Sequence, residues 1–105
     1  RPQTPFVAEF VGASNILPAD MVEAIIGIRA AARLRPEAIT FSDGPLQGVV
    51  ESHAFLGSAI RIEVMCNGQI IKVLVTKSGV VPVMGETVKL GWPAGALHIM
   101  DSTDG

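Results

Sequence analysis

The chain has 105 residues and a mass of 11.0 kDa, which is enough for one compact domain and too little for two. Hydrophobic residues make up 49% of the chain and can form a core, and this composition excludes a disordered segment. Its formal net charge of −2 and its aromatic content of 5% argue against a domain that binds nucleic acid. One cysteine, Cys66, cannot form an internal disulfide, which favours a reducing, cytoplasmic compartment.

The N-terminal segment predicts a short helix from Phe6 to Val11. It follows Thr4-Pro5, and the four-residue spacing of Phe6 and Phe10 places both rings on one face. Gly12 suits the left-handed residue that commonly ends a helix. A strand is the weaker interpretation of this segment, because its apolar and polar residues do not alternate.

A second helix is predicted over Pro18–Gly27. Pro18 fits the first helical position, Asp20 favours the positive end of the helix dipole, and Gly27 is a typical stop. Apolar residues recur here at the three-to-four spacing of a buried stripe, which consists of Leu17, Met21, Val22, Ile25 and Ile26.

The rest of the chain predicts short antiparallel strands separated by turns. In the clearest one apolar residues alternate with Arg61 and Glu63, and the Asn67-Gly68 dipeptide that follows favours a type I′ hairpin turn. The expected strands are Ala32–Leu34, Leu46–Phe55, Ala59–Met65, Gln69–Thr76, Thr87–Trp92 and Leu97–Met100. We therefore predict a mainly β domain, a small OB-like antiparallel barrel of five to six strands with one or two short N-terminal helices.

The sequence contains no motif of a self-contained enzyme. It lacks the GxxxxGK[ST] loop that cradles nucleotide phosphates. His53 and His98 are far apart, and neither has a second ligand at a metal-site spacing, so both are interpreted as packed or surface residues. Cys66 has no CxxC partner and no evident base. We predict no catalytic, cofactor-binding or metal-binding residues, and an independent enzyme ranks third behind the two hypotheses below.

A series of landmarks resembles one protein family. The string RPQTPFVAEFVG at residues 1–12, followed by Asn15-Ile16-Leu17, is similar to the segment where the nucleotide-binding domain of an ABC importer ATPase joins its C-terminal domain. An RPE string at 35–37 and LHIMD at 97–101 continue the family's order. The residues that match the family motifs are Phe6, Phe10, Gly12, Asn15, Arg35, Pro36, Glu37, Gly57, Gly85, His98 and Asp101. The chain thus resembles the transport-associated OB (TOBE) domain of an ABC importer ATPase of the polyamine, iron or sugar type.

This resemblance implies an organisation and a function. Residues 1–14 would be a linker or short helix from an upstream ATPase domain, residues 15–101 would form the barrel, and residues 102–105 would be a frayed tail. The start at Arg1-Pro2 is expected of the interior of a longer chain. The implied role is a non-catalytic regulatory and dimerisation domain of the ATP-binding subunit. No cofactor is implied here, since ATP and Mg belong to the upstream domain. The parent would bind a membrane permease at the cytoplasmic face of the inner membrane.

The sequence departs from the family pattern between Asn15 and Arg35. Only nineteen residues stand where the family has room for a β-hairpin, and they predict a helix. That part of the barrel is therefore expected to be missing, replaced by the helix, or completed by a second chain. Because an open barrel edge exposes unpaired backbone groups, we predict a homodimer, with strand exchange as one route.

The alternative function is a small-ligand binding module. Thr76, Lys77 and Ser78 partly match an oxyanion-binding turn of molybdate-type relatives, although an ordinary turn is the favoured interpretation. Arg35 and Glu37 likewise allow two interpretations, a dimer-contact or regulatory pair and a local pair beside a turn, of which the local pair is favoured.

Overall fold

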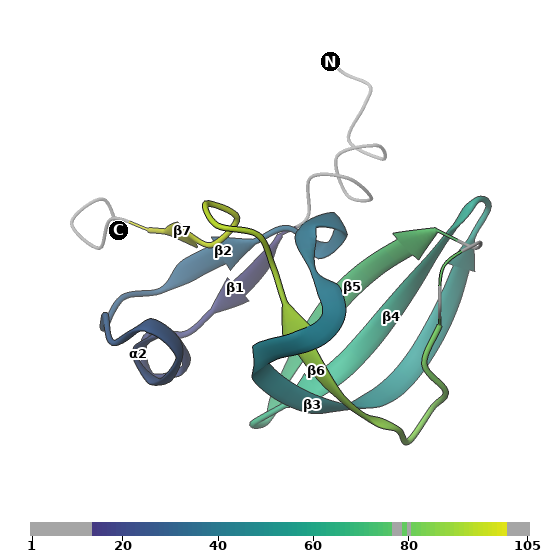
Figure 1. Cartoon of the computed structure of the whole chain (residues 1–105), viewed down its shortest axis with the longest axis horizontal. Coiled ribbons are helices and arrows are strands. Elements are labelled where there is room, and N and C mark those ends of the chain that lie inside the picture. Colours follow the sequence, from purple (N-terminus) through teal and green to yellow (C-terminus); the bar gives the residue numbers. More distant parts are fainter. Residues whose placement is uncertain (1–13, 77–78, 80, 101–105) are drawn as a thin grey trace, which may run out of the picture.

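The computed structural model describes residues 14–76, 79 and 81–100 (Figure 1). Within these ranges the fold is mainly β with one short α-helix, as predicted, and it has seven strands. No helix in the described part is long and apolar enough to cross a membrane. The helix predicted at 6–11 and the tail at 102–105 lie outside the described residues. In chain order the elements are β1 (Asn15–Leu17), helix α2 (Ala19–Ile26), β2 (Ala32–Leu34), the 3-10 turn η2 (Pro36–Ala38), β3 (Thr40–Leu56), β4 (Ala59–Cys66), β5 (Gln69–Thr76), β6 (Thr87–Gly91) and β7 (His98–Ile99).

The larger sheet has the strand order β5-β4-β3-β6, is antiparallel throughout, and curls into a half-barrel (Figure 1). Strand β4 alternates as predicted, with fully buried Ile62 between half-buried Arg61 and Glu63. The predicted hairpin turn joins β4 to β5, and its residues Asn67 and Gly68 have φ angles of 51° and 79°, as a type I′ turn requires.

Strand β3 is longer than predicted, because it begins at Thr40 rather than at Leu46. The Gly44-Pro45 pair, which has the composition of a turn, forms a bend inside the strand, and the pairing shifts there so that two β3 residues lie opposite Leu90 of β6. A Cβ atom on Gly44 would overlap the Leu90 carbonyl oxygen. Glycine therefore allows β3 and β6 to cross at close range, and the curl of the sheet depends on that crossing.

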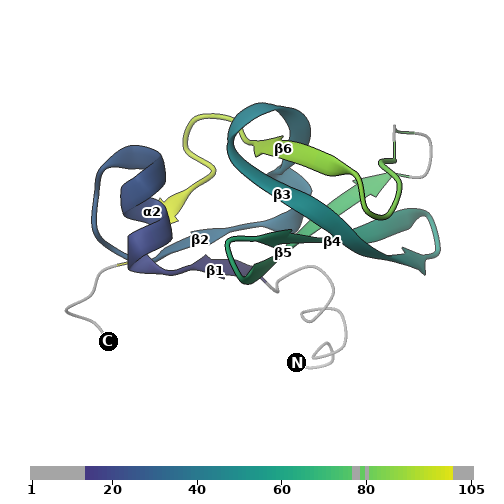
Figure 2. The same cartoon turned by 90° about the horizontal axis from the view of Figure 1, so that it is seen from below.

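The smaller sheet has the order β1-β2-β7 and is also antiparallel. Strand β2 has the predicted bounds, whereas β1 was not predicted. Its three residues are too few for an alternation to show, and they lie directly before the helix. Figure 2 shows α2 beside this small sheet, at the opposite end of the molecule from the β3–β4 turn.

Helix α2 differs from the prediction in its first residue and in the burial of Ile26. Pro18 precedes its first residue instead of being part of it, and Ile26, expected in the buried stripe, is 42% exposed. The helix has only 8 residues, so its fully packed face is short and consists of Met21 and Val22. Gly27, with a φ of 81°, ends the helix as predicted.

The last two strands are shorter than predicted. Strand β6 ends at Gly91, one residue before the predicted end at Trp92. Trp92 precedes Pro93, and a proline restricts the backbone conformation of the residue before it. Pro93 accepts a hydrogen bond from the Ala96 N–H at 3.1 Å, which closes the predicted turn. Strand β7 has only two residues, because β2 offers it only two partners.

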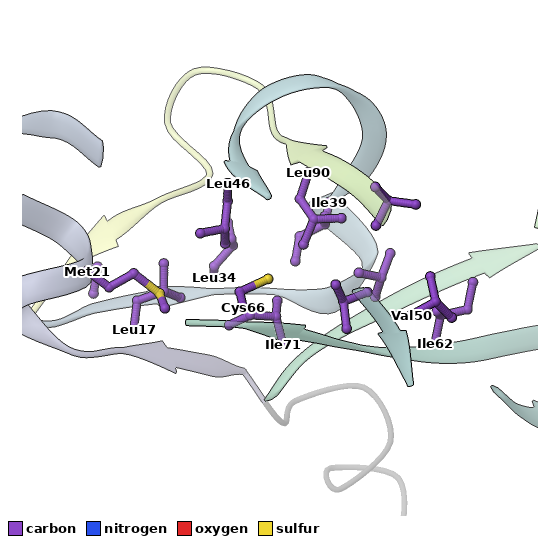
Figure 3. Close-up of a cluster of buried hydrophobic side chains, with 14 of the residues drawn as sticks. Leu17, Met21, Leu34, Ile39, Leu46, Val50, Ile62, Cys66, Ile71 and Leu90 are labelled. Carbon is purple, nitrogen blue, oxygen red and sulfur yellow. The ribbon is translucent and has the colours of Figure 1, made fainter. Parts of the chain in front are cut away.

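One hydrophobic core joins both sheets and the helix (Figure 3). Leu17 and Leu34 reach it from the small sheet, Met21 from α2, and Ile62 and Ile71 from the large sheet. Burial of a large aliphatic side chain contributes about 1.5–3 kcal/mol. The two sheets therefore share their main stabilising contacts and fold as one unit.

Candidate functional site

The two sheets are bridged at their junction by the side chain of Asn15. Its Nδ2 donates to the carbonyls of Leu34, at 3.1 Å, and Lys72, at 2.9 Å, and its Oδ1 accepts from the Lys72 backbone N–H at 2.7 Å. Asn15 is 6% exposed, and Figure 2 shows that β1, of which Asn15 is the first residue, begins beside β5. The Asn15 amide thus forms with Lys72 the two backbone hydrogen bonds that a neighbouring strand would form at the outer edge of β5. The role of this motif residue is structural.

The Arg35-Pro36-Glu37 string forms a turn that packs against β5. The Ala38 N–H donates to the Arg35 carbonyl at 3.1 Å, and Pro36 is buried. The Arg35 guanidinium lies 3.9 Å from the Glu37 carboxylate, with 72% and 39% of the two side chains exposed. A pair this exposed adds only about 0.2–1 kcal/mol. The local pair is observed, and a role in dimer contacts stays a prediction.

Two motif glycines occupy turns. Gly57, between β3 and β4, has a φ of 72°, and Gly85, before β6, has a φ of 88°. The Gly85 N–H donates to the Val50 carbonyl at 2.8 Å, and the Val50 N–H donates to the Glu86 carbonyl at 3.0 Å, which ties the loop before β6 to β3. The motif residues outside the described ranges are Phe6, Phe10, Gly12 and Asp101.

His98 lines a surface cavity of about 410 Å³ on the outer face of the small sheet. It lies directly opposite Arg33 in the β2–β7 pairing, and both side chains are exposed. The residues lining this cavity, which we call the Arg33 pocket, are Ser14, Arg33, Arg35, Ala38, Gly95, Ala96 and His98. The sequence analysis named Arg35 and His98 separately and missed Arg33. The alternation in β2 places Arg33 and Arg35 on one face, but no sequence signal showed that His98 pairs with β2.

The predicted oxyanion residues lie at the end of β5. Thr76 is the last residue of the strand and is exposed, whereas Lys77 and Ser78 lie outside the described residues. The Gly79 N–H donates to the Thr76 carbonyl at 3.1 Å, as in an ordinary turn. Oxyanion binding at this turn stays a prediction.

Two other residues considered for enzyme chemistry, Cys66 and His53, have contacts within the fold. Cys66 is fully buried in the core, and the Nε2–H of His53 donates to the Pro82 carbonyl at 2.8 Å. Among the described residues, no group of three His, Cys, Asp or Glu side chains is placed to hold a metal ion.

We expect Cys66 to react slowly with thiol reagents in the folded protein. Burial raises the pKa of its thiol from 9.0 to about 11, so the reactive thiolate is scarcer by about a hundredfold at neutral pH. Modification by a chromogenic disulfide should therefore be about a hundredfold slower in buffer than in denaturing urea. Equal rates in the two solvents would contradict the burial of Cys66.

The same shift predicts a pH dependence of the free energy of unfolding. The folded-state pKa of Cys66 lies above the unfolded value, so the neutral thiol stabilises the fold fully below about pH 9, and this contribution is lost as the pH rises towards 11. Urea titrations between these pH values should show a decline that Cys66→Val lacks. A decline of the same size in the variant would assign it to other groups.

The outer edge of β5 has no strand neighbour among the described residues. On the outer face of the large sheet, Val49, Met65 and Ile70 lie side by side across β3, β4 and β5. Val49 is 38% exposed, Ile70 is 36% exposed and Met65 is half-buried. We call these three residues the apolar row. It reaches the edge of the sheet at Ile70.

The chain belongs to the TOBE domain family, because the family model described as "TOBE domain" matches residues 32–100. The uncharacterized ABC transporter ATP-binding protein YdcT of Escherichia coli (strain K12) is 42% identical over 71 residues, which cover 65% of this chain and 21% of that protein. The uncharacterized ABC transporter ATP-binding protein y4fO of Sinorhizobium fredii (strain NBRC 101917 / NGR234) is 30% identical over 110 residues, which cover 100% of this chain and 32% of that protein. The chain therefore spans a third or less of the length of these relatives.

Proposed function

We propose that this chain is the non-catalytic regulatory and dimerisation domain of the ATP-binding subunit of an ABC importer. Its family supports this setting, and so do both relatives, which are named as ABC transporter ATP-binding proteins. ATP and Mg²⁺ would then bind to another domain of the same protein, which would act with a membrane permease at the cytoplasmic face of the inner membrane. The observation that carries the dimerisation role is the outer edge of β5.

The direction of the backbone groups along β5 follows from the contacts of Asn15. The N–H and carbonyl of Lys72 point away from β4, because both bond to Asn15. In an antiparallel strand this direction alternates, so Ile70, two residues earlier, also presents its N–H and carbonyl to the outer edge. These groups are available for a strand from a second copy, and an exposed edge of this kind favours pairing.

The apolar row gives such pairing a hydrophobic contact. Ile70 carries the row to the edge, so a second copy paired there would cover part of Ile70 and Met65. The proposed dimer is therefore an isologous pairing of the two β5 edges.

We expect the 105-residue chain to be a dimer at high micromolar concentration and Ile70→Lys to be a monomer. A lysine at the edge places two like charges face to face across the two-fold axis and removes the apolar contact. Sedimentation velocity measures both states.

The matched control is Val83→Lys. Val83 is 65% exposed and lies in the loop before β6, away from the β5 edge, so this variant adds the same charge and should remain a dimer. A monomeric parent chain would contradict the proposed dimer. Dissociation by both variants would assign the effect to net charge and contradict the proposed interface.

The importer setting is tested with the full-length gene product. We expect the full-length protein to hydrolyse ATP and the 105-residue chain to hydrolyse none. Hydrolysis by the chain alone, or none by the full-length protein together with its permease, would contradict the proposal.

A further inference from the structure

The Arg33 pocket gathers hydrogen-bond donors that have few partners in the protein. The side chains of Arg33 and His98 form no ion pair or hydrogen bond within the described part of the chain. Arg35 lies two residues after Arg33, on the same face of the extended chain, and Ser14 precedes the Asn15–Leu34 pair, which places it beside Arg35. The Arg33 pocket therefore presents two guanidinium groups, an imidazole and a hydroxyl.

The charge of the lining is positive in a protein that is negative overall. The formal net charge of the chain is −2, yet among the described residues no carboxylate lines the Arg33 pocket. The Glu37 carboxylate lies 3.9 Å from the Arg35 guanidinium and therefore competes with an anion for Arg35. Arg33 has no such competitor in the described ranges and is the main anchor for an anion.

The remaining walls are small and carry no polar side chains. Ala38, Gly95 and Ala96 complete the lining. One water molecule takes about 30 Å³ in the liquid. The cavity of about 410 Å³ therefore has room for an organic group beside a phosphate.

We propose that the Arg33 pocket binds a phosphomonoester of a small organic molecule. The phosphate would lie on Arg33 and Arg35, which match a dianion in charge and bind its oxygens in bidentate geometry, with His98 and Ser14 as further donors. The organic part would lie over Ala38 and Ala96. These residues differ from Thr76, Lys77 and Ser78, so this site is independent of the predicted oxyanion turn.

The test is a titration of the 105-residue chain with glucose 6-phosphate at constant ionic strength, followed by calorimetry and by backbone amide shifts. We expect saturable binding, with the largest shifts at Ser14, Arg33 and His98. Arg33→Gln should weaken binding by about tenfold or more, the usual effect of losing a charge-assisted contact. Glu37→Gln should strengthen it, because it removes the competitor of Arg35.

The matched control is Lys89→Gln, which removes an exposed cation of β6 outside the pocket and should leave binding unchanged. Because Arg33 is exposed, Arg33→Gln should keep the amide spectrum of the folded chain. No saturable binding, undiminished binding by Arg33→Gln, or equal binding of neutral glucose would overturn the proposal. Loss of binding in Thr76→Ala but not in Arg33→Gln would also overturn it and would place the anion at the 76–78 turn.

Discussion

Asn15→Ala is expected to lower the free energy of unfolding by about 2–4 kcal/mol. The substitution removes three hydrogen bonds at the junction of the two sheets and leaves the N–H and the carbonyl of Lys72 without the partner that the Asn15 amide supplies. A domain of this size is stabilised by only about 5–15 kcal/mol. Urea denaturation monitored by the fluorescence of Trp92 measures the loss.

The control for Asn15→Ala is Ser52→Ala. Ser52 donates one part-buried hydrogen bond to Glu63 within the large sheet, at 3.0 Å, so its loss should cost less than about 1 kcal/mol. If Asn15→Ala costs no more than Ser52→Ala, the amide of Asn15 does not hold the sheets together.

Gly44→Ala is expected to destabilise the fold by at least about 3 kcal/mol or to prevent folding. The added Cβ would overlap the Leu90 carbonyl oxygen and meet the Gly91 Cα atom. Both are backbone atoms of β6 and cannot rotate away, so β3 and β6 would have to separate where the large sheet curls. Circular dichroism and urea denaturation measure the effect.

The control for Gly44→Ala is Gly27→Ala. Gly27 has a φ of 81°, and nothing lies within 4 Å of the Cβ that the substitution would add. This variant therefore carries only the backbone cost of a left-handed non-glycine residue, about 1 kcal/mol. Equal losses in both variants would mean that the contact of Gly44 with β6 adds nothing.

The parts of the fold that could be predicted are those with local signals. The β4–β5 hairpin follows from its alternation and from Asn67-Gly68, since a two-residue turn fixes the register of its strands. Gly44-Pro45 misled the prediction of β3, because the same residues suit a turn and a bend inside a strand. The bend is chosen by contact with β6, more than forty positions later in the chain.

The candidate sites depend on contacts that no local pattern encodes. Asn15 forms hydrogen bonds with Lys72, which is 57 positions away. The sequence alone identified Asn15 only as a match to a family motif. His98 and Arg33 form one cavity because β7 pairs with β2, and β7 has only two residues. The family itself was predicted from motif residues and is confirmed by the TOBE domain match to residues 32–100, because a short motif can be identified in the sequence even where the contacts of its residues are distant.

Hydrogen exchange at the Ile70 amide tests the proposed role of the β5 edge most directly. The N–H of Ile71 points towards β4 and serves as the internal reference, because it should be protected at every protein concentration. The account predicts that the Ile70 amide exchanges rapidly in dilute protein and becomes protected at high concentration, when a second copy pairs with the edge. Rapid exchange of Ile70 at all concentrations would contradict it.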